Sequence, residues 1–179
     1  MSPRRDLVLL RHGKSDWSHD LPDTERPVGE RGWRQAAAAG RWLATRGPAL
    51  APGTARAVVS TAVRARTTWV LASAALPAPP PVHHLDELYT CDAEDVAAVV
   101  AALPSAVLAV VVVGHEPALG DLARDLSGRD LRMRTSELAW FTWAGAWADV
   151  GPHAAGGPAR LLAHGRPPDE RTAPPPSGV

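Results

Sequence analysis

The sequence predicts an α/β fold, in which a mostly parallel central sheet carries helices on both of its faces. Short apolar runs alternate with longer amphipathic segments, which is the pattern of buried parallel strands joined by crossover helices. The clearest apolar runs are Leu7–Leu10 and Val107–Val113. Between them, Trp33–Arg46 has helical periodicity with Trp33 and Leu43 on its apolar face, so we expect this helix to pack on the sheet.

Turn signals divide the rest of the chain into shorter elements of the same kinds. A second strand is expected over Ala55–Ser60, where Ser60 and Thr61 are residue types that cap the amino end of a helix. That helix is expected to run from about Ala62 to Ala75. The other expected elements are a strand over Val82–Leu85, a helix from Asp92 or Ala93 to Leu103, a helix over Pro117–Leu126, and strands over Leu138–Thr142 and Ala159–Ala163 at a sheet edge.

Length and composition describe one ordinary globular domain. The chain has 179 residues, and its 19 basic and 19 acidic residues argue against a nucleic-acid or membrane-surface partner. Cys91 is the single cysteine, so neither an internal disulfide nor a cysteine-based metal cluster is expected. Without a signal-peptide pattern, a cytoplasmic location is the expectation. We expect one domain over residues 1–164 and a proline-rich, disordered tail over residues 165–179.

Polar side chains follow three of the predicted strands at the point where each strand ends. In open α/β sheets, ligands bind outside the carboxyl ends of the strands, so parallel strands would bring these side chains to one rim. A glycine there lets the backbone turn sharply and approach a ligand closely. The predicted rim residues are Arg11, His12 and Gly13 after the first strand, Ser60 and Arg64 at the second, and His115 after the fourth.

Two histidines and two arginines on one rim are the residue types that phosphoryl transfer needs. Arginine pairs with two phosphate oxygens at once, and a neutral imidazole can attack phosphorus and hold the group as a phosphohistidine. Neighbouring arginines are expected to lower the pKa of that imidazole and keep it neutral. Arg26, in the loop after the first strand, is expected either to join the pocket or to pair with Asp23.

The order of these motifs resembles the histidine phosphatase superfamily, whose fold is also called phosphoglycerate mutase-like. Within that superfamily, the run from Arg11 to Trp17 is most similar to the SixA-type phosphohistidine phosphatases. The resemblance covers about residues 6–145. The motifs that carry it are Arg11-His12-Gly13, Arg26-Pro27 with Gly32 beyond, Ser60-x-x-x-Arg64-Ala65 and Gly114-His115.

The resemblance implies a phosphoglycerate mutase-like fold and a reaction without a metal or cofactor. It implies that His12 is the phosphoacceptor, that Arg11 and Arg64 bind phosphate, and that His115 is the second histidine. By the same resemblance, Arg26 is a further substrate-binding arginine. Gly13 and Ser60 are expected in the phosphate-binding part of the site.

The general acid is left open by the sequence. An alkoxide leaving group needs a proton, which many members of the superfamily supply from a carboxylate. Glu87 and Glu116 are the candidates, with Asp16 behind them. Each has a structural alternative, because Glu87 could cap the following helix and Glu116 stands at a helix start, where a carboxylate is favourable.

The expected substrate is a phosphohistidine-bearing protein. SixA-type enzymes manage with a reduced acid, which suits a phosphoramidate because imidazole leaves more easily than an alkoxide. A compact chain without a large insertion would leave the pocket open to a protein. A small phosphorylated metabolite, cleaved by a phosphomonoesterase or rearranged by a mutase, is the alternative, and a non-catalytic module that binds a phospho-ligand is the alternative of another class.

Overall fold

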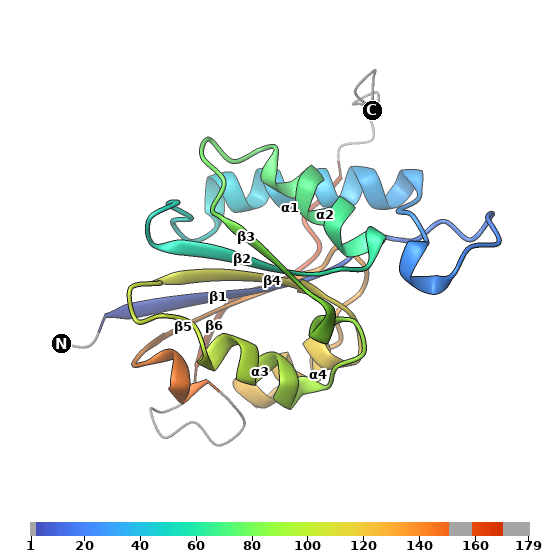
Figure 1. Cartoon of the computed structure of the whole chain (residues 1–179). Coiled ribbons are helices and arrows are strands. Elements are labelled where there is room, and N and C mark those ends of the chain that lie inside the picture. The colour runs from blue at the N-terminus through green and yellow to red at the C-terminus, as the bar shows by residue number, and fades with distance from the viewer. Residues whose placement is uncertain (1–2, 151–158, 170–179) are drawn as a thin grey trace.

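In the computed structural model, which describes residues 3–150 and 159–169, six strands form one sheet between two layers of helices. Helices α1 and α2 cover one face of the sheet, and α3 and α4 cover the other (Figure 1). The strands lie in the order β3-β2-β4-β1-β5-β6. Their bounds are β1 Arg4–Arg11, β2 Ala55–Ser60, β3 Val82–Leu85, β4 Ala109–Gly114, β5 Leu138–Ala144 and β6 Arg160–Gly165. The helices are α1 Glu30–Arg46, α2 Val63–Ser73, α3 Ala93–Ala101 and α4 Ala118–Ser127, with short 3-10 helices η1 Asp23–Glu25, η2 Asp86–Leu88 and η3 Trp147–Asp149.

Strand β1 lies in the middle of the sheet and determines where the functional rim falls. It pairs in parallel with β4 on one side and antiparallel with β5 on the other. In the parallel register, Arg11 lies opposite Gly114, so the residues that follow, His12 and His115, leave the sheet side by side. The predicted α/β fold with a mostly parallel sheet is confirmed.

The continuous apolar run of β1 is explained by burial on both faces. Leu7 and Leu9 belong to the core beneath α3 and α4, whereas Val8 and Leu10 belong to the core beneath α1 and α2. All four side chains are completely buried. A strand that fills two cores can hold its carboxyl end rigidly in place, which suits a strand that delivers functional residues.

Three expectations about individual elements are wrong in detail. Trp33 was placed on the buried face of α1, but it lies in the first turn of that helix and is 37% exposed. Ser60 and Thr61 do not cap α2, because their hydroxyls contact His115 and Asp86 and the helix begins after Ala62 without a side-chain cap. Only β6 of the two late strands is at the sheet edge, since β5 pairs with both of its neighbours.

The expected tail falls partly outside the described residues. Gly165 closes β6, and Arg166 Nε donates a hydrogen bond to the carbonyl oxygen of Thr135 at 2.8 Å. Residues 170–179 lie outside the part of the chain that the structure describes. Within that part, no helix combines the length and the apolar character needed to cross a membrane.

Helices α1 and α2 approach closely where α1 has small residues. A Cβ atom added to Gly40 would overlap the backbone carbonyl of Ala72, which lies in α2. Arg64, which is predicted to bind phosphate, also lies in α2. The close approach of the two helices therefore fixes the height of Arg64 above the sheet.

We predict that Gly40→Ala destabilises the fold by about 1–3 kcal/mol, because the added methyl group forces the two helix backbones apart. Urea unfolding followed by circular dichroism measures the change. Gly53→Ala is the matched control, since a Cβ atom there meets nothing within 4 Å. Equal stability of the Gly40 variant and the control would contradict the close packing of α1 on α2.

Candidate active site

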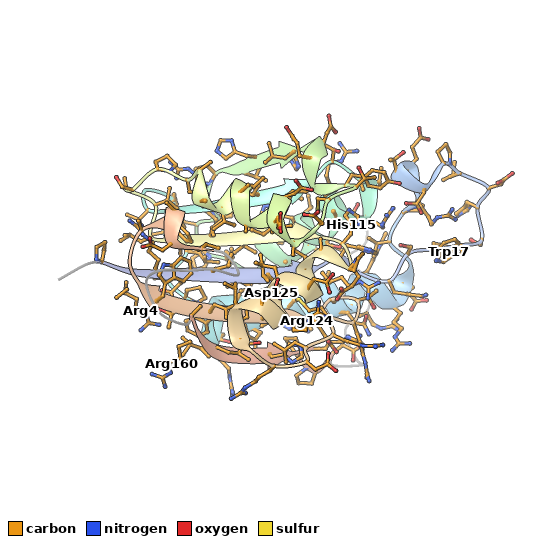
Figure 2. The ribbon with its side chains drawn as sticks, turned by 90° about the horizontal axis from the view of Figure 1, so that it is seen from below. Arg4, Trp17, His115, Arg124, Asp125 and Arg160 are labelled. Carbon is orange, nitrogen blue, oxygen red and sulfur yellow. The ribbon has the colours of Figure 1, made fainter. Side chains whose placement is uncertain are left out.

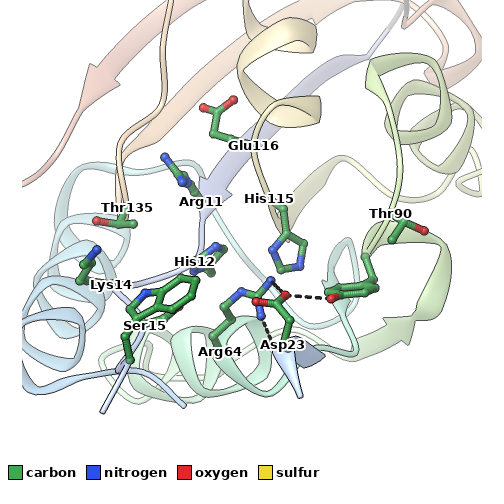
Figure 3. Close-up of a pocket in the computed structure, with 12 residues that line it drawn as sticks. Arg11, His12, Lys14, Ser15, Asp23, Arg64, Thr90, His115, Glu116 and Thr135 are labelled. Carbon is green, nitrogen blue, oxygen red and sulfur yellow. Dashed lines mark hydrogen bonds and ion pairs between the residues drawn. The ribbon is translucent and has the colours of Figure 1, made fainter. Parts of the chain in front are cut away.

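A cavity of about 350 Å³ opens at the carboxyl ends of β1 and β4. Its walls include all four residues that the sequence predicted to meet there, Arg11, His12, Arg64 and His115 (Figure 3). Trp17 lies on a loop that projects from this end of the molecule, whereas Arg4 and Arg160 mark the opposite end (Figure 2).

His12 is held in one tautomer by the backbone. Its Nδ1 lies 2.8 Å from the carbonyl oxygen of Gly13. A carbonyl oxygen can only accept a hydrogen bond, so Nδ1 carries the ring proton and Nε2 keeps its lone pair. The ring is 8% exposed, and burial, followed by the neighbouring His115 and the arginines, lowers the pKa of His12 to about 3. His12 is therefore a neutral imidazole near pH 7 with Nε2 as its basic nitrogen.

His115 stands beside His12, with 4.9 Å between the ring centroids. Its Nε2 lies 2.9 Å from the hydroxyl of Ser60, which is completely buried, and Tyr89 packs edge-on against it. Burial, and next the charge of Arg64, lower the pKa of His115 to about 4. We expected the arginines to keep the nucleophilic imidazole neutral, whereas burial is the larger cause for both rings.

Arg64 reaches the cavity from the first turn of α2 and is 7% exposed. Its Nη2 donates to Asp23 Oδ2 at 2.8 Å, and its Nη1 donates to the main-chain oxygen of the same residue. Both ends of the guanidinium fork are thus occupied by one residue of the loop between β1 and α1. An anion that binds both Nη1 and Nη2 of Arg64 would compete with Asp23 for these two nitrogens.

Arg11 forms another part of the wall and is held from behind by the segment before β5. Its Nη1 donates to the carbonyl oxygen of Met133 at 2.8 Å. Its Nε is buried and has no hydrogen-bond partner among the described residues. Arg11 is therefore positioned without using all of its donors.

Gly13 and Thr68 join the end of β1 to α2. The Gly13 N–H donates to the Thr68 hydroxyl at 2.8 Å, and that hydroxyl donates to the Arg64 carbonyl oxygen at 2.6 Å. A Cβ atom at Gly13 would lie 3.1 Å from the carbonyl oxygen of Gly32, which explains the small residue there. Thr68 was not anticipated from the sequence, because a mid-helix threonine carries no local signal of such a contact.

Asp23 is one of the cavity-wall residues that the sequence did not indicate, together with Tyr89, Thr90 and Thr135. Besides Arg64, its carboxylate accepts a hydrogen bond from the Tyr89 hydroxyl at 2.8 Å. The bonds from Tyr89 and Arg64 hold the pKa of Asp23 below its usual value. The sequence suggests Asp23 only as a partner of Arg26, and its place in the same loop after the Arg-His-Gly motif is the signal that could have indicated it.

Arg26 does not belong to the cavity lining. Its guanidinium lies over the ring of Trp17, 3.9 Å from the centroid, and its Nε is 3.5 Å from Asp23 Oδ1. Both of these partners line the cavity. Arg26 thus supports two wall residues and makes the expected pair with Asp23.

The three acids considered from sequence lie in different surroundings. Glu87 is exposed in η2 and does not line the cavity. Asp16 is also outside the lining and accepts hydrogen bonds from the backbone and hydroxyl of Ser18. Glu116 lines the cavity, but its Oε1 accepts a hydrogen bond from the Met133 N–H at 2.8 Å, and burial raises its pKa. Of these three, Glu116 alone reaches the wall.

Comparisons with known proteins found a matching family and several similar proteins. The sequence model of the histidine phosphatase superfamily (branch 1) matches residues 7–100. An uncharacterized protein of Mycobacterium tuberculosis is 34% identical over 154 residues, covering 80% of this chain and 92% of that protein. An uncharacterized protein of Mycobacterium leprae is 33% identical over 152 residues, covering 77% and 89% of the two chains.

Solved structures give the same fold. A protein of Nakamurella multipartitia, described as a candidate SixA phosphohistidine phosphatase, matches with a TM-score of 0.76 and 31% identity. The match covers 93% of this chain and 98% of that one. The protein histidine phosphatase SixA complexed with tungstate matches with a TM-score of 0.73 and 25% identity, covering 90% and 97%.

We predict that mild acid destabilises the fold through the two buried histidines. In the folded chain, the pKa values of His12 and His115 lie below their ordinary value of 6.5. As the pH falls below 6.5, these two histidines therefore take up protons in the unfolded chain but stay neutral in the folded chain. The free energy of unfolding therefore falls with pH, by up to about 1.4 kcal/mol per pH unit for each ring. Urea unfolding at about pH 7 and about pH 5 measures this loss.

The variant His12→Asn should lose less stability between those two pH values than the unsubstituted chain does. His84→Asn is the control, because His84 is exposed on β3. If the His12 variant loses as much stability on acidification as the control, His12 is not a buried neutral ring.

Proposed function

Since the chain belongs to the histidine phosphatase superfamily, we propose that it hydrolyses a phosphorylated substrate through a covalent phosphohistidine on His12. One observation carries this proposal. The Gly13 carbonyl fixes the proton of His12 on Nδ1, so that Nε2 is the nitrogen with a free lone pair. A neutral imidazole with a defined basic nitrogen is the nucleophile that this reaction requires.

In the first step, Nε2 attacks phosphorus while the bond to the leaving group breaks. The phosphoryl group carries charge on three equatorial oxygens, and the guanidinium groups of Arg11 and Arg64 are fixed on the cavity wall to stabilise it. The ring of His115, 4.9 Å from that of His12, completes the surroundings of the transferred group. In the second step, water attacks phosphorus, the bond to Nε2 breaks, and phosphate is released.

The electrostatics of the site suit both steps. Burial keeps His12 neutral although cations surround it, so its lone pair remains available at neutral pH. Once Nε2 is bonded to phosphorus, the ring becomes a cation whose Nδ1–H still donates to the Gly13 carbonyl. The phosphoryl oxygens then compensate the new positive charge.

The substrate that we favour is a phosphohistidine-bearing protein, with a small phosphorylated metabolite as the alternative. Two solved structures that match most of the chain, at 31% and 25% identity, are described as SixA proteins. Trp17 lines the cavity of about 350 Å³ and is 66% exposed. An open rim of this kind can admit a side chain that projects from a folded protein.

We predict that His12→Ala lowers phosphatase turnover at least about 1,000-fold, because no other group replaces the nucleophile. Hydrolysis of 4-nitrophenyl phosphate and of a phosphohistidine peptide measures the loss, and acid-labile, base-stable radiolabel on the unsubstituted chain reports the intermediate. His84→Ala, an exposed histidine outside the cavity, should keep full activity. Undiminished turnover of both substrates by the His12 variant would remove His12 from the mechanism.

A further inference from the structure

Two carboxylates, Glu116 and Asp23, line the cavity, and their surroundings differ. Glu116 is engaged by the Met133 backbone N–H and lies on the far side of Arg11 from Arg64 (Figure 3). Asp23 accepts hydrogen bonds from Arg64 and Tyr89. Its side chain lies on the same side of the cavity as Arg64 and His115 (Figure 3). Asp23 is also the carboxylate whose charge acts on His115, whereas the charge of Glu116 acts on Arg11.

The hydrogen bonds of Asp23 place it in direct competition with a phosphoryl group. Its Oδ2 accepts from both Arg64 Nη2 and the Tyr89 hydroxyl, each at 2.8 Å. Arg64 is a guanidinium that a bound phosphoryl group would use, and a phosphoryl oxygen that binds Nη2 meets Asp23 Oδ2 at the same nitrogen. The side chain of Asp23 is 47% exposed, which leaves it room to move along the cavity wall.

Resting on the function proposed above, we propose that Asp23 is the general acid for the leaving group, and that it takes up its proton when a phosphoryl group displaces it from Arg64. No sequence motif singled out this residue as an acid. The assignment rests on its contacts with Arg64 and Tyr89 and on its place in the cavity wall.

Substrate binding supplies the change in proton affinity that this role needs. The hydrogen bonds from Tyr89 and Arg64 lower the pKa of Asp23 and so favour its ionised carboxylate. A phosphoryl dianion removes the bonds from Arg64 and brings a second negative charge next to Asp23. Both changes raise the pKa of Asp23, so the carboxylate takes a proton from solvent as the substrate enters.

The proton balance closes over the two steps. In the first step, the Asp23 proton moves to the leaving-group oxygen as the P–O bond breaks and the bond from His12 Nε2 to phosphorus forms. In the second step, the Asp23 carboxylate takes a proton from the attacking water as its oxygen bonds to phosphorus and the P–Nε2 bond breaks. When phosphate departs, Asp23 returns its proton to solvent and pairs again with Arg64.

This role depends on the leaving group and therefore separates two classes of substrate. A phosphate ester expels an alkoxide or phenoxide, which needs a proton in the transition state. A phosphoimidazole whose second ring nitrogen already carries a proton leaves as neutral imidazole and needs no acid. Loss of the Asp23 carboxylic acid should therefore leave the hydrolysis of phosphoramidates almost unchanged. It should slow the hydrolysis of phosphate esters most where the leaving group is poor.

The experiment compares the full chain with Asp23→Asn on phenyl phosphate, 4-nitrophenyl phosphate and phosphoimidazole. The variant should lose about 100-fold or more in kcat/KM with phenyl phosphate, less than about 10-fold with 4-nitrophenyl phosphate, and less than about threefold with phosphoimidazole. Asp23→Glu, which keeps a carboxylic acid, should recover part of the phenyl phosphate activity. Asp20→Asn is the matched control, because Asp20 is exposed in the same loop and outside the cavity lining.

Two outcomes would overturn the assignment. An equal loss of kcat/KM on all three substrates means that Asp23 only supports the loop. An equal gain in kcat/KM means that Asp23 only competes with substrate for Arg64. A failure of the proposed function itself looks different, since the unsubstituted chain would then form no labelled phosphohistidine on His12 with any of the three substrates.

Discussion

The parallel pairing of β1 with β4 is the constraint on which the site depends. Because Arg11 lies opposite Gly114, the two histidines that follow leave neighbouring strands at the same height. Each strand is anchored by side chains in both cores, so the rim inherits the rigidity of the sheet. Helix α2 then adds Arg64, and the Thr68 hydroxyl connects that helix to the backbone just after His12.

Burial and charge act together on the two imidazoles. Desolvation alone favours the neutral ring, and the adjacent guanidinium groups add to that preference. The same guanidinium groups favour an incoming phosphoryl anion. In the mechanism that we propose, a single arrangement therefore keeps the lone pair of His12 available before the reaction and stabilises the charge that is transferred during it.

Sequence reasoning located the features that depend on local pattern. The apolar run before Arg11-His12-Gly13 and the run before Gly114-His115 predicted two buried strands and the meeting of both histidines. It failed where distant segments compete for one polar group. Ser60 is a good capping residue, yet its hydroxyl contacts His115, and Asp23 faces Arg64 and Tyr89, which are 41 and 66 residues away along the chain. Local patterns do not report such contacts.

The measurement that tests the central claim most directly is the site of phosphorylation on the His12 ring. Nitrogen-15 and phosphorus-31 NMR of the trapped phosphoenzyme distinguishes a P–Nε2 bond from a P–Nδ1 bond. The hydrogen bond from Nδ1 to the Gly13 carbonyl predicts phosphorus on Nε2 alone. Phosphorus on Nδ1, or on a residue other than His12, would contradict the account.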